Sequence, residues 1–134
     1  MNRAIKFRGK SFDSGKGIYG FYSERNGKSY IQMDWEVILT PVDPATVGQL
    51  TGLKDKSERE IYEGDVFTVN GKYPKLVKYK EDRACFCISN TDQMCDEGWM
   101  DIWQSPNPRW WSDHSAKIEI IGNIYDNPEL LKTE

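Results

Sequence analysis

Two Asn-Gly pairs constrain this chain most strongly, because each fixes a tight turn. Asn26-Gly27 and Asn70-Gly71 each stand between runs of residues suited to extended backbone. Asn and Gly accept the positive φ angles that a two-residue hairpin turn needs, and such a turn joins antiparallel strands. We therefore predict one hairpin in each half of the chain and a mainly β fold.

Residues 1–53 predict an N-terminal β-meander that ends in a connecting segment. Residues 4–8 alternate apolar and basic side chains, as a half-buried strand does. The aromatic run at 17–23 predicts a second strand, which returns after the turn at 28–33. Residues 35–39 are the next predicted strand.

Residues 54–134 predict a C-terminal β domain. Its strands are expected at 66–69, 76–80, 84–89 and 117–125. Gly122 is expected to bend the last strand into two halves. Asn127 and Pro128 then begin a short helical turn that packs Leu130 and Leu131 back. Five short strands, counting both halves of the bent one, and a closing turn suit an SH3-like small barrel.

The connecting segment between the two parts contains several turns. Asp43 can accept hydrogen bonds from the amides that follow it, and Pro44 fits the first position of a helical turn. Residues 54–60 hold six charged side chains and one serine, so we expect a solvent-exposed turn there. Glu63-Gly64-Asp65 predicts a tight turn before the strand at 66–69.

Three parts of the chain resemble one protein family. The first part is Ile5-Lys6-Phe7-Arg8-Gly9 with Tyr19-Gly20-Phe21-Tyr22. The second is Val42-Asp43-Pro44-x-Thr46-Val47-Gly48-Gln49-x-Thr51-Gly52-Leu53-x-Asp55, followed by Ile61-Tyr62-Glu63-Gly64-Asp65. The third is Ile120-Ile121-Gly122-Asn123-Ile124-Tyr125-Asp126-Asn127-Pro128-Glu129-Leu130-Leu131. Together they resemble the YopX family of phage and prophage proteins. The resemblance implies a small β-rich fold with an SH3-like C-terminal part, and it implies no known activity and no catalytic residue.

The charge is distributed unevenly along the chain. Residues 3–28 hold seven basic and two acidic side chains, whereas residues 61–134 hold eight and 13. The pI of about 5.3 argues against nucleic-acid binding by the whole surface, but a local basic face is compatible with it. No apolar run approaches the roughly 20 residues of a membrane-spanning helix. The N-terminus lacks the apolar core of a signal peptide. We therefore expect a cytoplasmic protein without membrane contact, and the family resemblance implies that the cell is a bacterial host.

One acidic segment, residues 89–116, is rich in tryptophan. Its four tryptophans are Trp99, Trp103, Trp110 and Trp111. Such side chains favour burial at interfaces, because they combine a large apolar area with a polar group. The acids at 92–101 could also meet the basic N-terminal part of a second copy. We therefore expect a homo-oligomer with these tryptophans as the candidate interface, or an unidentified protein partner.

The basic and aromatic residues near the N-terminus suggest a nucleic-acid face, where rings stack on bases and cations meet phosphates. The wider set is Arg3, Lys6, Arg8, Lys10, Lys16, Arg25 and Lys28 with Tyr19, Phe21, Tyr22 and Tyr30. The candidate face is Arg3, Lys6, Arg8, Lys10, Tyr19, Tyr22 and Lys28. A solvated strand face over an aromatic core explains the same residues, and we favour that simpler interpretation.

Two sets of residues could carry metal or acid–base chemistry. Cys85, Cys87, Cys95 and His114 are the possible zinc ligands. The C-x-C spacing differs from the usual C-x2-C of zinc sites, so we expect no zinc and no other cofactor.

Glu63, Asp65, Asp101, Asp113 and His114 are the possible acid–base or magnesium-binding set of a hydrolase. Turn chemistry already explains Glu63 and Asp65. No phosphate-binding loop or nucleophile motif accompanies them, so we assign no catalytic residues. We predict a non-catalytic binding or assembly module, with nucleic-acid binding as the alternative.

Overall fold

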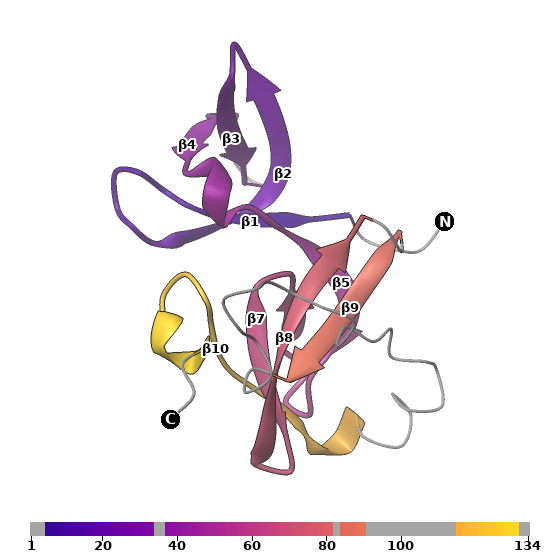
Figure 1. Cartoon of the computed structure of the whole chain (residues 1–134). Coiled ribbons are helices and arrows are strands. Elements are labelled where there is room, and N and C mark those ends of the chain that lie inside the picture. The colour runs from indigo at the N-terminus through magenta and orange to yellow at the C-terminus, as the bar shows by residue number, and fades with distance from the viewer. Residues whose placement is uncertain (1–4, 34–36, 82–83, 91–114, 132–134) are drawn as a thin grey trace. The chain divides into compact units, whose positions relative to one another are not determined.

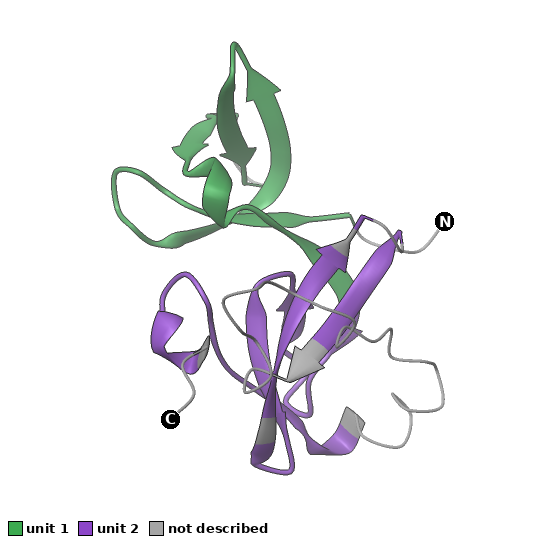
Figure 2. Cartoon of the chain, in the orientation of Figure 1, with its two compact units in different colours: residues 1–52 green, residues 53–134 purple. Residues whose placement is uncertain are grey.

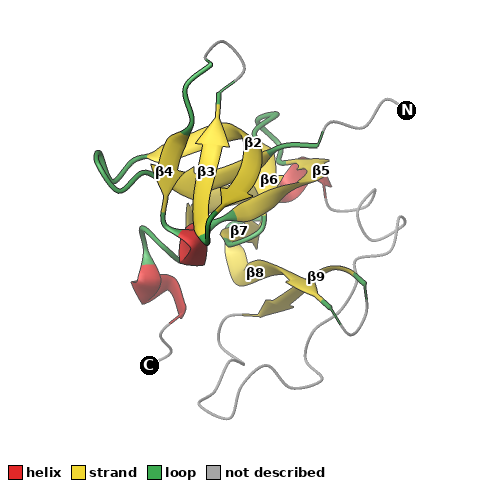
Figure 3. Ribbon diagram, turned by 90° about the horizontal axis from the view of Figure 1, so that it is seen from above, coloured by secondary structure: helices red, strands yellow, loops and turns green. Residues whose placement is uncertain are grey.

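The protein is mainly β, as the sequence predicts. The computed structural model describes residues 5–33, 37–81, 84–90 and 115–131 (Figure 1). The chain divides into two compact units, unit 1 (Met1–Gly52) and unit 2 (Leu53–Glu134) (Figure 2). Every helix within the described ranges is a short 3-10 turn (Figure 3). None of these described helices has the length and apolar character needed to cross a membrane. The assignment of residues 1–53 and 54–134 to two separate domains stays a prediction.

Unit 1 is built on consecutive antiparallel strands. Its elements are β1 (Phe7–Lys10), β2 (Gly17–Arg25), β3 (Lys28–Gln32), β4 (Thr40–Val42), η1 (Pro44–Thr46) and the first five residues of β5 (Gly48–Lys54), whose last two residues belong to unit 2. Strands β1 to β4 lie side by side in chain order, and β5 returns to the free edge of β1. Unit 1 therefore begins as a meander, and β5 leads the chain onward.

The core of unit 1 lies on one face of this sheet, its inner face. Ile31 and Val42 are fully buried there. The rings of Phe7 and Tyr22 pack beside each other with centroids 5.6 Å apart. Gly9 leaves the room that the core needs, because a Cβ at this position would lie 3.2 Å from the side chains of both Ile31 and Val42.

The strand predicted at 35–39 is wrong. Residues 37–39 have no strand structure, residues 34–36 lie outside the described ranges, and β4 begins only at Thr40. Val42 is fully buried, whereas Val37 and Ile38 are 91% and 65% exposed. The apolar run beginning at Val37 suggested a strand, but the inner face of the sheet accepts Val42 instead.

Unit 2 contains a four-stranded antiparallel sheet and a short additional strand. Its elements are β6 (Glu60–Tyr62), β7 (Asp65–Val69), β8 (Lys72–Lys80), β9 (Cys85–Asn90), η3 (Ser115–Lys117), β10 (Ile118–Asn123) and η4 (Pro128–Leu131). The sheet has the order β10-β7-β8-β9, and β6 is hydrogen-bonded to β5. Its core cluster is Ile61, Phe67, Val77, Ile88 and Ile118. The described strands form an open sheet without a closed barrel, so the SH3-like detail stays a prediction.

Both Asn-Gly pairs form the predicted hairpin turns. The φ angles are 53° and 78° at Asn26-Gly27, and 57° and 76° at Asn70-Gly71. Both residues of each pair thus have the positive φ of a two-residue hairpin turn. The first turn joins β2 to β3 and the second joins β7 to β8.

The end of unit 2 closes as predicted, with a bent strand and a helical turn. The register of β10 against β7 shifts between Ile120 and Gly122. A Cβ at Gly122 would lie 2.5 Å from Asn127 Oδ1, so a side chain there would displace Asn127. Asn127 Oδ1 accepts a hydrogen bond from the backbone N of Asn123, and Leu130 packs against the second apolar cluster of unit 2.

The turn at Asn26-Gly27 leads to the first prediction. Gly27→Val should lower the free energy of unfolding by about 1–2 kcal/mol, because a β-branched side chain resists positive φ. A Cβ at Gly27 would meet no atom within 4 Å, so the loss would come from the backbone alone. Gly27→Asn is the matched control, since Asn tolerates this conformation, and thermal denaturation measures both. A melting temperature of Gly27→Val equal to that of the wild type would contradict the turn assignment.

Candidate functional site

The face of the unit 1 sheet opposite its core gathers aromatic and basic side chains. Residues two apart in a strand share a face, and so do residues paired across strands. Tyr19 and Phe21 of β2 therefore lie on one face, and Gln32 pairs with Phe21. We call this surface the outer face. It carries Tyr19, Phe21, Ser23, Arg25, Lys28, Tyr30 and Gln32, and Arg8 lies buried on the same side of the sheet.

The outer face leaves two aromatic rings in water. Tyr19 is 47% exposed and Phe21 is 58% exposed. The residues between and beside them, Ile18, Gly20 and Tyr22, are less exposed and face the core. Burial of an aromatic side chain stabilises a fold by roughly 1.5–3 kcal/mol, so these exposed rings leave much of that gain unused. Burial in the core of unit 1 therefore does not account for them.

The outer face is also basic. Arg25 and Lys28 pair at the end of the β2–β3 hairpin, and both are exposed. Strands β1 to β4 contain a single acidic residue, Glu24. Glu24 pairs with Ser29, whose position belongs to the inner face. These four strands therefore place no carboxylate on the outer face.

Only part of the predicted nucleic-acid face lies on the outer face. Tyr19 and Lys28 belong to it. Arg8 pairs with Tyr19 but is only 9% exposed. Lys6 and Lys10 follow the same alternation as Arg8 along the first strand, and both are half-buried.

Tyr22 lies away from the other predicted residues. Its ring packs against Phe7 on the inner face, and its hydroxyl lies 3.0 Å from Ser29 Oγ. Arg3 lies outside the described residues.

The seven-residue prediction omitted Phe21, Arg25 and Tyr30, which the structure places on the outer face. The signal was present in the sequence. Strand alternation from Tyr19 selects Phe21, and the register fixed by the Asn26-Gly27 turn brings β3 against it.

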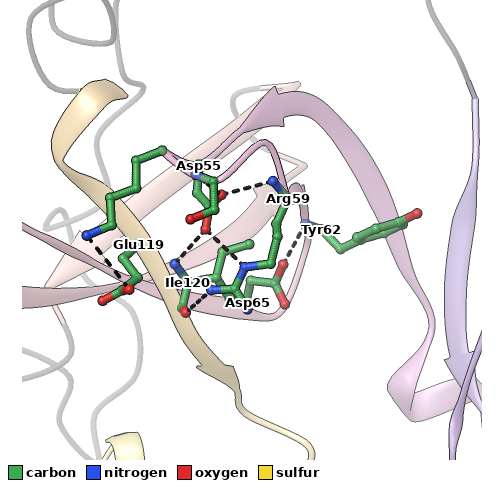
Figure 4. Close-up of polar contacts among 8 residues, drawn as sticks. Asp55, Arg59, Tyr62, Asp65, Glu119 and Ile120 are labelled. Carbon is green, nitrogen blue, oxygen red and sulfur yellow. Dashed lines mark hydrogen bonds and ion pairs between the residues drawn. The ribbon is translucent and has the colours of Figure 1, made fainter.

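A buried carboxylate organises the turn between β5 and β6 (Figure 4). The side chain of Asp55 is 0% exposed. Its Oδ1 accepts hydrogen bonds from the backbone N of Ser57 and of Arg59, each at 2.9 Å. Its Oδ2 accepts from Arg59 Nε and from the backbone N of Ile120, each at 3.2 Å. The prediction that residues 54–60 are wholly solvent-exposed is thus wrong at Asp55, because these four donors replace water.

The environment of Asp55 sets its ionisation. Burial alone would raise the pKa of the carboxyl group. Hydrogen bonds from the backbone of Arg59, Ile120 and Ser57, and from the Arg59 side chain, act against burial and hold the pKa below its usual value. Asp55 therefore stays ionised at neutral pH and contributes to the fold as an acceptor.

The two described residues of the predicted acid–base set, Asp65 and Glu63, also accept hydrogen bonds from backbone N–H groups. Asp65 is 2% exposed, and its Oδ2 accepts from the backbone N of Tyr62 at 2.8 Å. Glu63 Oε2 accepts from the backbone N of Tyr79 at 3.1 Å. The remaining members, Asp101, Asp113 and His114, lie outside the described residues. In the part of the chain that the structure describes, no group of three or more His, Cys, Asp or Glu could hold a metal ion.

The two described cysteines lie in the core region of unit 2. Cys85 and Cys87 are two apart on β9, and their sulfurs are 3.8 Å apart. Cys87 is fully buried and clusters with Val66 and Leu76, as a small core hydrophobe does. Cys95, His114 and the four tryptophans of the predicted interface, Trp99, Trp103, Trp110 and Trp111, lie outside the described residues. The absence of zinc therefore stays a prediction.

The motif that begins at Val42 and resembles the YopX family also uses its first polar side chains to hold local backbone. Asp43 Oδ1 accepts from the backbone N of Ala45 at 3.0 Å and caps η1. Thr46 Oγ1 donates to the Asp43 carbonyl and accepts from the backbone N of Lys10 at 2.9 Å. The predicted helical turn at Asp43-Pro44 is thus confirmed.

Known proteins resemble this chain in sequence and in fold. The sequence pattern of the YopX protein family matches residues 6–132. No curated protein sequence matches the chain significantly. Among solved structures, the crystal structure of protein EF1440 from Enterococcus faecalis is similar, with a TM-score of 0.54 and 20% sequence identity. The match covers 98% of this chain and 100% of that chain. At this identity the likeness shows a shared fold alone.

The hydrogen bonds of Asp55 lead to the second prediction. Asp55→Asn keeps the size of the side chain but replaces one acceptor by an NH₂ donor that faces N–H groups, so it should lower the free energy of unfolding by about 1–3 kcal/mol. Because the folded pKa of Asp55 is lowered, its contribution is complete at neutral pH and is lost as the pH falls through that pKa. The difference in melting temperature between wild type and variant should therefore shrink below about pH 4.

Glu58→Gln is the control, because the Glu58 side chain in the same turn is 83% exposed and its ion pair with Lys54 is a surface one. It should change stability by less than about 1 kcal/mol. An Asp55→Asn protein as stable as the wild type at neutral pH would contradict the role of the carboxylate.

Proposed function

Because the chain belongs to the YopX family, and because its described buried carboxylates hold backbone, we propose that it is a non-catalytic binding module. Its binding surface is the outer face of unit 1. The observation that carries this proposal is the exposure of Tyr19 and Phe21 on adjacent outward positions of β2. Exposed apolar residues that stand together mark interaction sites more often than those scattered singly.

The distribution of exposed apolar residues supports the choice of unit 1. Eight large apolar side chains in the described residues are exposed, and six of them belong to unit 1. The six are Ile5, Phe12, Tyr19, Phe21, Val37 and Ile38. Unit 2 contributes only Tyr79 and Ile121 to this set, so among the described residues the exposed large apolar side chains are concentrated in unit 1.

Three finer features belong to the same proposal. The resemblance suggests a phage or prophage origin, with a place in the cytoplasm of the bacterial host. An SH3-like character of unit 2 is supported by its antiparallel order β10-β7-β8-β9 and by the adjoining β6.

Self-association is the second form of binding that we propose, with Trp99, Trp103, Trp110 and Trp111 at the interface. Light scattering at tens of micromolar protein in low salt should give a mass above that of the 15.5 kDa chain. The charged component should weaken with salt, and the apolar component should not. A monomer mass contradicts self-association. An oligomer that persists in Trp110→Ala/Trp111→Ala contradicts the location at these two residues.

The outer face itself is tested by Tyr19→Ser/Phe21→Ser. Both rings are about half exposed and neither lies in the core, so the double variant should still fold, which a thermal melt establishes. In a pull-down from a lysate of bacterial cells, the double variant should no longer retain the proteins or nucleic acids that the wild type retains. Mass spectrometry and nucleic-acid staining compare the retained material. Tyr79→Ser, at an exposed aromatic residue of unit 2, is the matched control. Identical retention by the double variant and the wild type would refute a role of this face.

A further inference from the structure

Building on the proposed binding role of the outer face, we propose that its partner is a single-stranded nucleic acid. The bases stack on Tyr19 and Phe21, and the phosphates meet Arg25 and Lys28. Two features carry this inference: the spacing of the rings and the basic charge on the same face.

The two rings are spaced for separated bases. Residues two apart in a strand are about 6.8 Å apart, which is about twice the 3.4 Å step between stacked bases of a DNA strand. Bases that occupy both rings therefore cannot also be stacked on each other as in a helix. A duplex covers the faces of its bases with their neighbours, so only a single strand presents them to the sheet.

The charge on the outer face suits a polyanion. Arg25 and Lys28 lie at the hairpin end of the same face, and Glu24 pairs with a residue of the opposite face. Unit 1 as a whole holds seven basic and five acidic side chains, whereas unit 2 holds 11 and 16. A nucleic acid is therefore attracted to unit 1 and repelled by unit 2, which favours one location on a chain whose net charge is -3.

The combination of rings and cations favours a nucleic acid over an acidic protein segment as the partner of the outer face. A carboxylate-rich peptide complements Arg25 and Lys28 but offers no flat face for Phe21. A nucleotide offers both a flat base and a phosphate, and it repeats them along the strand. Tyr30, half-buried on β3 within the same face, adds a hydroxyl that can meet a base edge or a phosphate.

The test uses the full chain and fluorescence anisotropy with a labelled oligothymidine of about 12 nucleotides, within the site sizes known for stacking platforms. A duplex of the same length and a polyglutamate peptide are the comparison ligands. The variants are Phe21→Ser and Lys28→Gln, with Tyr79→Ser and Lys54→Gln of unit 2 as matched controls. A thermal melt of each variant establishes that it is folded.

We expect the oligothymidine to bind at low salt, with a slope of log affinity against log salt of roughly -1 to -2 for two phosphate contacts. Phe21→Ser should weaken binding about tenfold or more. Lys28→Gln should reduce the salt slope by about 0.7. The control variants should bind like the wild type, and the duplex and the peptide should bind more weakly than the single strand.

Several outcomes overturn the inference: no binding by the folded wild-type chain at low salt, equal binding of the duplex, equal or tighter binding of polyglutamate, or full binding by Phe21→Ser. If the oligothymidine fails but Tyr19→Ser/Phe21→Ser still loses retained material from the lysate, the proposed binding function stands and only the nucleic acid is excluded. If the double variant also retains everything, the binding function of this face fails as well.

Discussion

The buried carboxylate of Asp55 is the contact on which the arrangement of unit 2 depends. Removing such a group from water costs several kcal/mol, and the cost is offset only if hydrogen bonds replace the lost water. Four N–H donors do so, and one of them belongs to Ile120, 65 residues along the chain. Lys56 N adds a bond to the Ile118 carbonyl at 2.8 Å. The turn at the start of unit 2 therefore sets the position of β10, and with it the burial of Ile118 in the core.

The same use of polar groups recurs through the segments that identify the family. Asp43 caps η1, Asp65 closes the turn before β7, and Asn123 Oδ1 accepts from the backbone N of Tyr125 and of Asp126. Each of these side chains replaces a hydrogen bond that a turn cannot make with its own backbone. The polar side chains of the family signature thus hold turns of the fold in place.

Local chemistry was predictable from the sequence, and distant contacts were not. The Asn-Gly turns, the cap at Asp43 and the bend at Gly122 depend on residues within a few positions, so the sequence shows them directly. The burial of Asp55 depends on β10, and nothing near Asp55 in the sequence indicates it. The wrong strand prediction at 35–39 has a similar cause. A short apolar run is compatible with a strand or with an exposed loop, and only pairing with another strand decides between them. The outer face was within reach, since strand alternation and one hairpin register define most of it.

The register that builds the core of unit 1 also builds its outer face. Side chains alternate along a strand, so a pairing that directs Ile31 and Val42 inward must direct Phe21 and Tyr30 outward. A slip of one residue would exchange the two faces and bury Arg25 and Lys28 in place of the core, at a cost that no fold of this size could sustain. The tight turn at Asn26-Gly27 therefore fixes the core and the outer face of unit 1 at once. The partly exposed rings of Tyr19 and Phe21 follow from the same register, because they alternate with the inward-facing residues of β2.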